Sequence, residues 1–193
     1  MFSRDVERAL RVSFAAHAGQ VRKSLEPVPY ATHPFHVALL LARLGHDDVV
    51  LQAALLHDVV EDCEGWTLER VEREFGPAVR AIVAELTEDK TQSWEARKRA
   101  AVDHVGGMSP GALAVKAADK LHNLRTLVDD LAASADRARV WSRFNGGRER
   151  TIALSAELVA ALERRVEPRL GNALRATLAE LAGFAREDVG EAG

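Results

Sequence analysis

One segment constrains the fold more than any other part of the chain. The sequence DVVLQAALLHDVV, residues 48–60, carries apolar side chains on nearly every face of an α-helix. Such a helix is stable only when other helices surround it, because every exposed face would leave apolar surface in water. The segment therefore predicts a buried central helix inside a helical bundle.

The rest of the chain has the same helical periodicity. Apolar residues recur at spacings of three and four, and alternating strand patterns are scarce. Residues 20–32 are rich in loop signals, and Thr67 and Ser93 are expected N-caps. The sequence thus predicts an all-α fold, with helices over residues 4–18, 34–44, 48–60, 68–76, 77–89, 93–105, 112–131, 135–144, 148–165 and 172–185.

Length and charge narrow the class of protein. We expect one domain over residues 1–193, since a chain of 193 residues can bury one sizeable core. Lys and Arg number 26 against 29 Asp and Glu, so no global positive charge favours nucleic acid or an anionic membrane. We therefore expect the partner to be a small molecule. An anionic one would bind through a local basic patch. Homo-oligomerisation stays open.

Two further features favour the cytoplasm. Cys63 is the single cysteine, which excludes an intrachain disulfide. The first residues, MFSRDVERALRVSF, carry charges throughout, unlike a secretory signal, and no stretch reaches the roughly 20 apolar residues of a membrane span. We therefore expect a cytoplasmic protein with no membrane partner.

Polar side chains interrupt the end of the apolar segment. His57 and Glu61 lie four residues apart, as do Asp58 and Asp62, so a helix would project two adjacent polar columns. Burial of an unpaired carboxylate costs several kcal/mol, and this segment holds three carboxylates. Either the helix emerges into solvent as an acidic end, or these residues form a functional site.

Two other polar groups stand at helical positions. Asp119 lies one turn before Asn123 within KAADKLHN, and His33 precedes Pro34 at an expected helix start. Taken singly, Asp119 could be a salt-bridged surface residue and His33 a packing residue. Taken with His57 and Asp58, they offer two imidazoles and two carboxylates. Such mixed ligands suit an octahedral divalent ion such as Mn²⁺ or Fe²⁺ better than a structural zinc.

The motifs resemble a known family. The chain is similar to HD-domain metal phosphohydrolases, specifically the Rel/SpoT-type (p)ppGpp hydrolase branch that includes the small alarmone hydrolases. The likeness covers about residues 16–127, and the family's elements occur in order: AHAGQVRKS at 16–24, THP at 32–34, AALLHDVVED at 53–62, FGPAVRAIVAELTEDK at 75–90 and KAADKLHNLRTL at 116–127. The resemblance implies an HD-domain helical bundle, completed by C-terminal helices over 135–187.

The resemblance also implies roles for single residues. It implies Mn²⁺-dependent release of pyrophosphate from the 3′ position of (p)ppGpp, a reaction that yields GDP or GTP. The matched positions are the metal ligands His33, His57, Asp58 and Asp119, the catalytic pair Glu61 and Asp62, the nucleotide-binding loop Arg22, Lys23 and Ser24, and the substrate contact Asn123.

One loop departs from the family pattern. Between Ser24 and His33 the chain is two residues longer than the family's usual spacing, and Leu25 stands where the family has glycine. We expect this departure to affect recognition of the base rather than the metal site. Two alternatives therefore stay open: an HD phosphohydrolase for another nucleotide or a phosphorylated cofactor, and a catalytically silent nucleotide-binding module. The intact Glu61 and Asp62 argue against the silent module.

Overall fold

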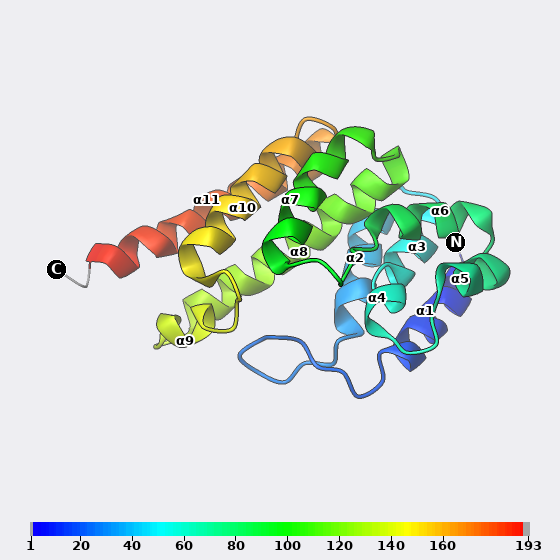
Figure 1. The fold of residues 1–193 in the computed structure, drawn as a ribbon, viewed down its shortest axis with the longest axis horizontal. Helices are drawn as coiled ribbons and strands as arrows, with labels where there is room; N and C mark the ends of the chain where they lie inside the picture. The colour runs from blue at the N-terminus through cyan, green and yellow to red at the C-terminus, as the bar shows by residue number, and fades with distance from the viewer. Residues whose placement is uncertain (1, 191–193) are drawn as a thin grey trace.

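The computed structural model describes residues 2–190, and over these residues the fold is all-α, as predicted (Figure 1). Its β-type pairing there is limited to an isolated bridge between Val21 and Pro29. The α-helices are α1 Arg4–Ala16, α2 Thr32–Arg43, α3 Asp48–Leu56, α4 Val59–Asp62, α5 Leu68–Phe75, α6 Pro77–Leu86, α7 Trp94–His104, α8 Pro110–Ala133, α9 Arg137–Trp141, α10 Gly147–Leu162 and α11 Pro168–Gly190, with a 3-10 turn at Val105–Gly107.

Helix α3 is the buried centre that the apolar segment predicts. It packs against α1, α2, α6 and α8, and its residues Ala53, Ala54, Leu55 and Leu56 are 0–2% exposed. Burial of each leucine side chain is worth roughly 2 kcal/mol, which makes α3 a major contributor to the core. The Asp47 side chain caps the helix by accepting a hydrogen bond from the amide of Val50.

The expected continuous helix over 48–60 is wrong at its C-terminal end. Helix α3 ends at Leu56, and a separate single turn, α4, begins at Val59. In a continuous helix the carbonyl of Ala54 would accept from the amide of Asp58, but here it accepts from Nδ1 of His57, at 2.7 Å. The polar side chain therefore competes with the backbone at the point where the helix breaks.

Helix α8 is the long strut of the molecule. It packs against α2, α3 and α6 on one side and against α10 and α11 on the other (Figure 1). The core positions predicted for this helix are confirmed at Leu113, Ala117, Leu124, Val128 and Leu131, which are 0–3% exposed, whereas Leu121 is only partly buried. Four polar residues of α8 line one cavity of the molecule: Lys116, Asp119, Lys120 and Asn123.

Local sequence accounts for many helix boundaries. The expected N-caps are confirmed, because the side chains of Thr67 and Ser93 accept from the amides of Arg70 and Ala96. Gly76, with φ +87°, joins α5 to α6, a conformation that side chains with a Cβ rarely adopt. The last three expected helices begin and end up to five residues away from α9, α10 and α11.

One cluster of buried apolar residues runs from Ala9 in α1 to Leu181 in α11. Such a continuous core is what the one-domain prediction requires, although the division of the chain into domains stays a prediction. Within the described part of the chain, helices with the length and apolar character needed to cross a membrane are absent.

Candidate metal and phosphate site

Two chain segments bring three of the four predicted ligands together. His33 lies in the first turn of α2, while His57 and Asp58 occupy the break between α3 and α4. The two imidazoles are 1% and 5% exposed. We call His33, His57 and Asp58 the ligand cluster, because one ligand atom from each lies within 4.8 Å of the others.

The geometry of His57 fits a metal ion. Its Nδ1 donates to the carbonyl of Ala54, at 2.7 Å, so that in the neutral form of the ring the lone pair lies on Nε2. That Nε2 is buried and has no hydrogen-bond partner, although Oδ2 of Asp58 lies 3.3 Å away. Buried polar nitrogens are rarely left unsatisfied, so an unpaired acceptor beside a carboxylate suits coordination of a cation.

The carboxylates near these imidazoles are held in the ionised form. Oδ2 of Asp58 lies 3.7 Å from Nε2 of His33. Burial opposes ionisation of Asp58, but the charges of His57 and His33 outweigh it and lower its pKa. At Asp119 burial is likewise outweighed by a hydrogen bond and charge from His33, which hold the pKa well below its usual range. Both groups are thus acceptors at neutral pH.

Asp119 stands beside the ligand cluster rather than inside it. Its Oδ1 lies 3.2 Å from Nε2 of His33 and accepts from Nδ2 of Asn123, at 2.5 Å. Arg22 extends this chain of contacts, because its Nη2 donates to Oδ1 of Asn123, at 2.7 Å. A polar relay therefore connects Arg22 to His33 across the site. The predicted ligand role of Asp119 stays a prediction.

Two residues that sequence reasoning missed form hydrogen bonds with members of the ligand cluster. The hydroxyl of Tyr30 donates to Oδ2 of Asp58, at 2.6 Å, and burial next to that carboxylate raises the pKa of Tyr30. Nδ1 of His122 lies 2.9 Å from Nδ1 of His33, and burial together with His33 lowers the pKa of His122 to about 3. The sequence signal that could have found them is proximity to a predicted ligand, since Tyr30 lies close to His33 and His122 lies close to Asp119.

The predicted catalytic pair lies on the single turn α4. Oε1 of Glu61 accepts from the amide of Glu88, at 2.6 Å, and burial raises the pKa of Glu61. Asp62 forms an ion pair with Lys90, whose ammonium also donates to the carbonyl of Glu61, at 2.8 Å. Sequence reasoning missed Lys90, although it ends the family-like motif at 75–90. The segment after α6 thus fixes both acidic residues.

We call the loop over residues 20–31 the substrate loop. Two of its predicted substrate-binding residues, Lys23 and Ser24, differ in their surroundings. Lys23 lines a cavity next to the ligand cluster. Ser24 instead bonds within the loop, because its hydroxyl donates to the carbonyl of Glu26, at 2.5 Å. The binding roles of Lys23 and Ser24 stay predictions.

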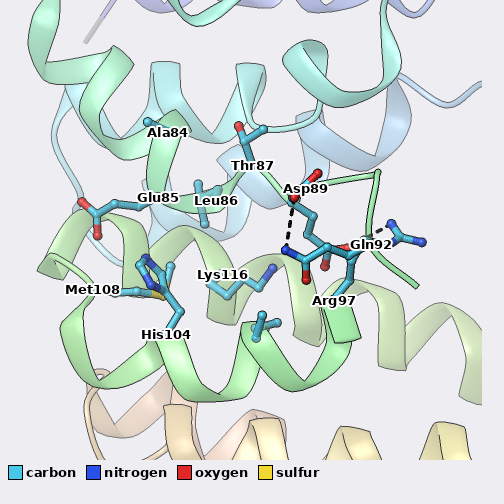
Figure 2. A pocket seen from close by; sticks show the side chains of 13 residues that line it. Ala84, Glu85, Leu86, Thr87, Asp89, Gln92, Arg97, His104, Met108 and Lys116 are labelled. Atoms are coloured by element: carbon cyan, nitrogen blue, oxygen red, sulfur yellow. Dashed lines mark hydrogen bonds and ion pairs between the residues drawn. The ribbon is translucent and has the colours of Figure 1, made fainter. Parts of the chain in front are cut away.

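Three adjoining cavities surround Lys116. One of about 280 Å³ contains the ligand cluster together with Glu61 and Asp62. The next, of about 370 Å³, is rich in cations: Lys23, Arg97, Lys98, Lys116, Lys120 and Arg143. Figure 2 shows the third, of about 240 Å³, where Lys116 projects between Leu86 and His104. Because Lys116 lines all three cavities, they share a wall.

The cationic cavity matches the chemistry of phosphate groups. Its Lys120 donates to the hydroxyl of Ser155, at 2.8 Å, and burial lowers the pKa of Lys120 to about 8. Trp94 and Phe144 provide apolar surface on the same wall, which gives a nucleotide both charge and stacking partners. Arg143 and Asn145 from the segment after α9 also line this cavity.

Known proteins match both the sequence and the structure. The human guanosine-3′,5′-bis(diphosphate) 3′-pyrophosphohydrolase MESH1 is 52% identical over 118 residues, which are 59% of this chain and 65% of that protein. The Xenopus tropicalis protein of the same name is 50% identical over 141 residues, or 71% of this chain and 78% of its own length. The chain thus spans just under two thirds of the human relative.

A solved structure extends the likeness to the C-terminal helices. It belongs to a metazoan ortholog of SpoT that hydrolyzes ppGpp and plays a role in starvation responses. The TM-score is 0.80 at 31% identity, and the match covers 93% of this chain and 97% of the other. The family model of the HD domain matches residues 9–149, which include every predicted site residue. The chain therefore belongs to the HD domain family.

Proposed function

We propose that the chain is a metal-dependent hydrolase that releases pyrophosphate from the 3′ position of (p)ppGpp. The observation that carries the proposal is the ligand cluster, in which the buried Nε2 of His57 faces Asp58 without a hydrogen-bond partner. The names of the human and Xenopus relatives, and of the solved ortholog, support the choice of substrate. The cations beside the cluster support a substrate with several phosphates.

We propose that His33, His57 and Asp58 hold a divalent ion, with Asp119 as a fourth ligand. Nitrogen and oxygen ligands without thiolates suit Mn²⁺ or Fe²⁺, and the resemblance to (p)ppGpp hydrolases favours Mn²⁺. When bound, such an ion neutralises phosphate charge and makes hydroxide available from water near neutral pH. Tyr30 and His122 orient the ligands through their hydrogen bonds to Asp58 and His33.

Glu61 is the proposed proton carrier. Its Oε1 is fixed by the amide of Glu88, and its raised pKa places the carboxyl nearer to the working range of a general acid or base. In the reaction, a water oxygen bonds to the phosphorus attached to the 3′ oxygen while the bond between that oxygen and the phosphorus breaks. Glu61 takes a proton from the water and returns it to the leaving 3′ oxygen, while Asp62, held by Lys90, orients Glu61 or the water.

Substrate contacts follow from the remaining polar residues. Arg22 presents a planar guanidinium that can stack on a purine, and it is positioned by Asn123 and by the ring of Tyr30, 5.7 Å away. Lys23 would offer a point charge to phosphate at the cationic cavity. Ser24 would complete the loop, and Asn123 would contact the substrate between Arg22 and Asp119. A cytoplasmic location for this activity stays a prediction.

An activity panel tests the proposal. Purified protein is incubated with Mn²⁺ and one nucleotide in each reaction: ppGpp, GTP, a nucleoside monophosphate or a phosphorylated dinucleotide. The products of each reaction are separated by chromatography. We expect ppGpp to yield GDP and pyrophosphate, and Glu61→Gln to show little turnover under the same conditions. Untouched ppGpp beside hydrolysis of another nucleotide would favour the alternative phosphohydrolase. Binding of ppGpp without any cleavage would favour the silent module.

A further inference from the structure

The substrate loop is closed at its base but projects at its tip. Val21 and Pro29 form the isolated bridge, and the amide of Arg22 donates to the carbonyl of Val28, at 2.9 Å. A second bond joins the amide of Tyr30 to the carbonyl of Gln20, at 2.9 Å. These bonds set the direction of the loop, whereas residues 23–27 extend beyond them. The tip therefore needs contacts with another part of the molecule to stay in one place.

A single carboxylate in α8 contacts the tip and its neighbour. Oδ1 of Asp130 accepts from the amide of Leu25, at 3.4 Å. Oδ2 of Asp130 accepts from Nη2 of Arg143, at 2.8 Å, and Nη1 of Arg143 donates to the carbonyl of Lys23, at 3.2 Å. These contacts form a closed ring from Leu25 through Asp130 and Arg143 back to Lys23. We call this ring the latch.

The latch is built from partly buried charges. The Asp130 and Arg143 side chains are 14% and 21% exposed, so their ion pair is less screened than a surface pair. By contrast, the neighbouring Asp129 is 63% exposed and pairs with Arg125 on the side of α8 that faces α11. Two consecutive aspartates thus serve different elements, and only Asp130 contacts the substrate loop.

The latch also explains how the loop accommodates Leu25. Asp130 binds the backbone amide at this position, and the Leu25 side chain is 40% exposed. The contact therefore does not require glycine. Arg143, which is paired with Asp130, donates to the carbonyl of Lys23, and the Lys23 side chain lines the cationic cavity together with Arg143.

We propose that Asp130 is a positioning residue that, through Arg143 and the amide of Leu25, holds Lys23 and Arg22 in place for substrate. The inference rests on the proposed function only in assuming that this loop binds the nucleotide. Asp130 touches neither the ligand cluster nor Glu61. Its loss consequently changes substrate binding and leaves both metal content and the chemical step intact.

The test compares Asp130→Ala with Asp129→Ala, a matched change one residue away. For Asp130→Ala we expect KM for ppGpp to rise about tenfold with kcat within about twofold, because a hydrogen-bonded charge that orders a binding loop is lost. Hydrogen exchange should speed up at the amide of Leu25, while the amide of Ala117 in the core of α8 keeps its protection. Asp129→Ala should change neither KM nor exchange in the loop.

A conservative variant guards against general damage to the fold. Asp130→Asn keeps an acceptor for the Leu25 amide and should restore much of its protection, with KM between wild type and Asp130→Ala. Equal behaviour of Asp130→Ala and Asp129→Ala, or a fall in kcat with unchanged loop exchange, would overturn the inference. A wild-type protein that is inert toward ppGpp would refute the proposed function. The exchange experiment would still show whether Asp130 holds the loop, because it needs no substrate.

Discussion

The ligand cluster and the substrate loop are held in opposite ways. His33 and His57 are 1% and 5% exposed and sit at the ends of helices that belong to the core. In the substrate loop, Val21 and Leu25 are 60% and 40% exposed, and few hydrogen bonds fix the tip. The ligand cluster is therefore anchored in the core, whereas the tip of the substrate loop is held by few contacts. If the proposed roles hold, chemistry and substrate choice depend on parts of the molecule that are stabilised separately.

The largest effect should come from a change in the ligand cluster. Asp58→Ala removes a ligand carboxylate, and we expect loss of bound Mn²⁺ and a fall in kcat/KM of about 10³-fold or more. Metal analysis after dialysis, together with steady-state kinetics, measures both. Asp48→Ala at the exposed start of α3 serves as the control and should keep metal and activity. Retention of Mn²⁺ by Asp58→Ala would contradict the ligand assignment.

Glu61→Gln should separate the proton carrier from the metal. The amide can still accept from the Glu88 amide, so α4 stays in place, but general acid–base catalysis is lost. We expect kcat to fall about 10²-fold with the Mn²⁺ content unchanged. If metal content fell as far as in Asp58→Ala, the division of roles between the ligand cluster and α4 would be wrong.

Tyr30→Phe tests how the loop end supports the metal site. The change deletes the 2.6 Å hydrogen bond to Asp58 and keeps the ring near His17 and His33. We expect the affinity for Mn²⁺ to fall by about 10- to 100-fold, with activity restored at high Mn²⁺. A Mn²⁺ titration followed by activity checks this. Unchanged affinity would mean that Asp58 is held well enough without Tyr30.

The smallest effect should come from the substrate loop itself. Arg22→Ala removes a guanidinium that serves bound substrate and transition state alike, so KM should rise about tenfold while kcat changes little. Steady-state kinetics with ppGpp measures both parameters. Arg11→Ala is the matched control, because that exposed arginine pairs with Glu7 on α1. A selective fall in kcat would place Arg22 in the chemical step.

Sequence reasoning predicted the helices from local patterns, because periodicity and N-caps such as Thr67 depend on neighbours within one turn. It proposed His33, His57 and Asp58 as ligands from motif spacing, and the structure brings them together. It did not predict the contact of His122 with His33, which joins residues 89 positions apart. Nor did it predict the break after Leu56, since that depends on which group the Ala54 carbonyl accepts from.

The short helix α4 has a consequence for anyone who wishes to transplant this site. The motif HDVVED reads as one continuous peptide, yet its two halves are anchored by different parts of the protein. His57 and Asp58 directly follow the buried end of α3, while Glu61 and Asp62 depend on Glu88 and Lys90. A graft that copied residues 48–62 alone would keep the sequence of the motif but lose the contacts with Glu88 and Lys90 that position Glu61 and Asp62.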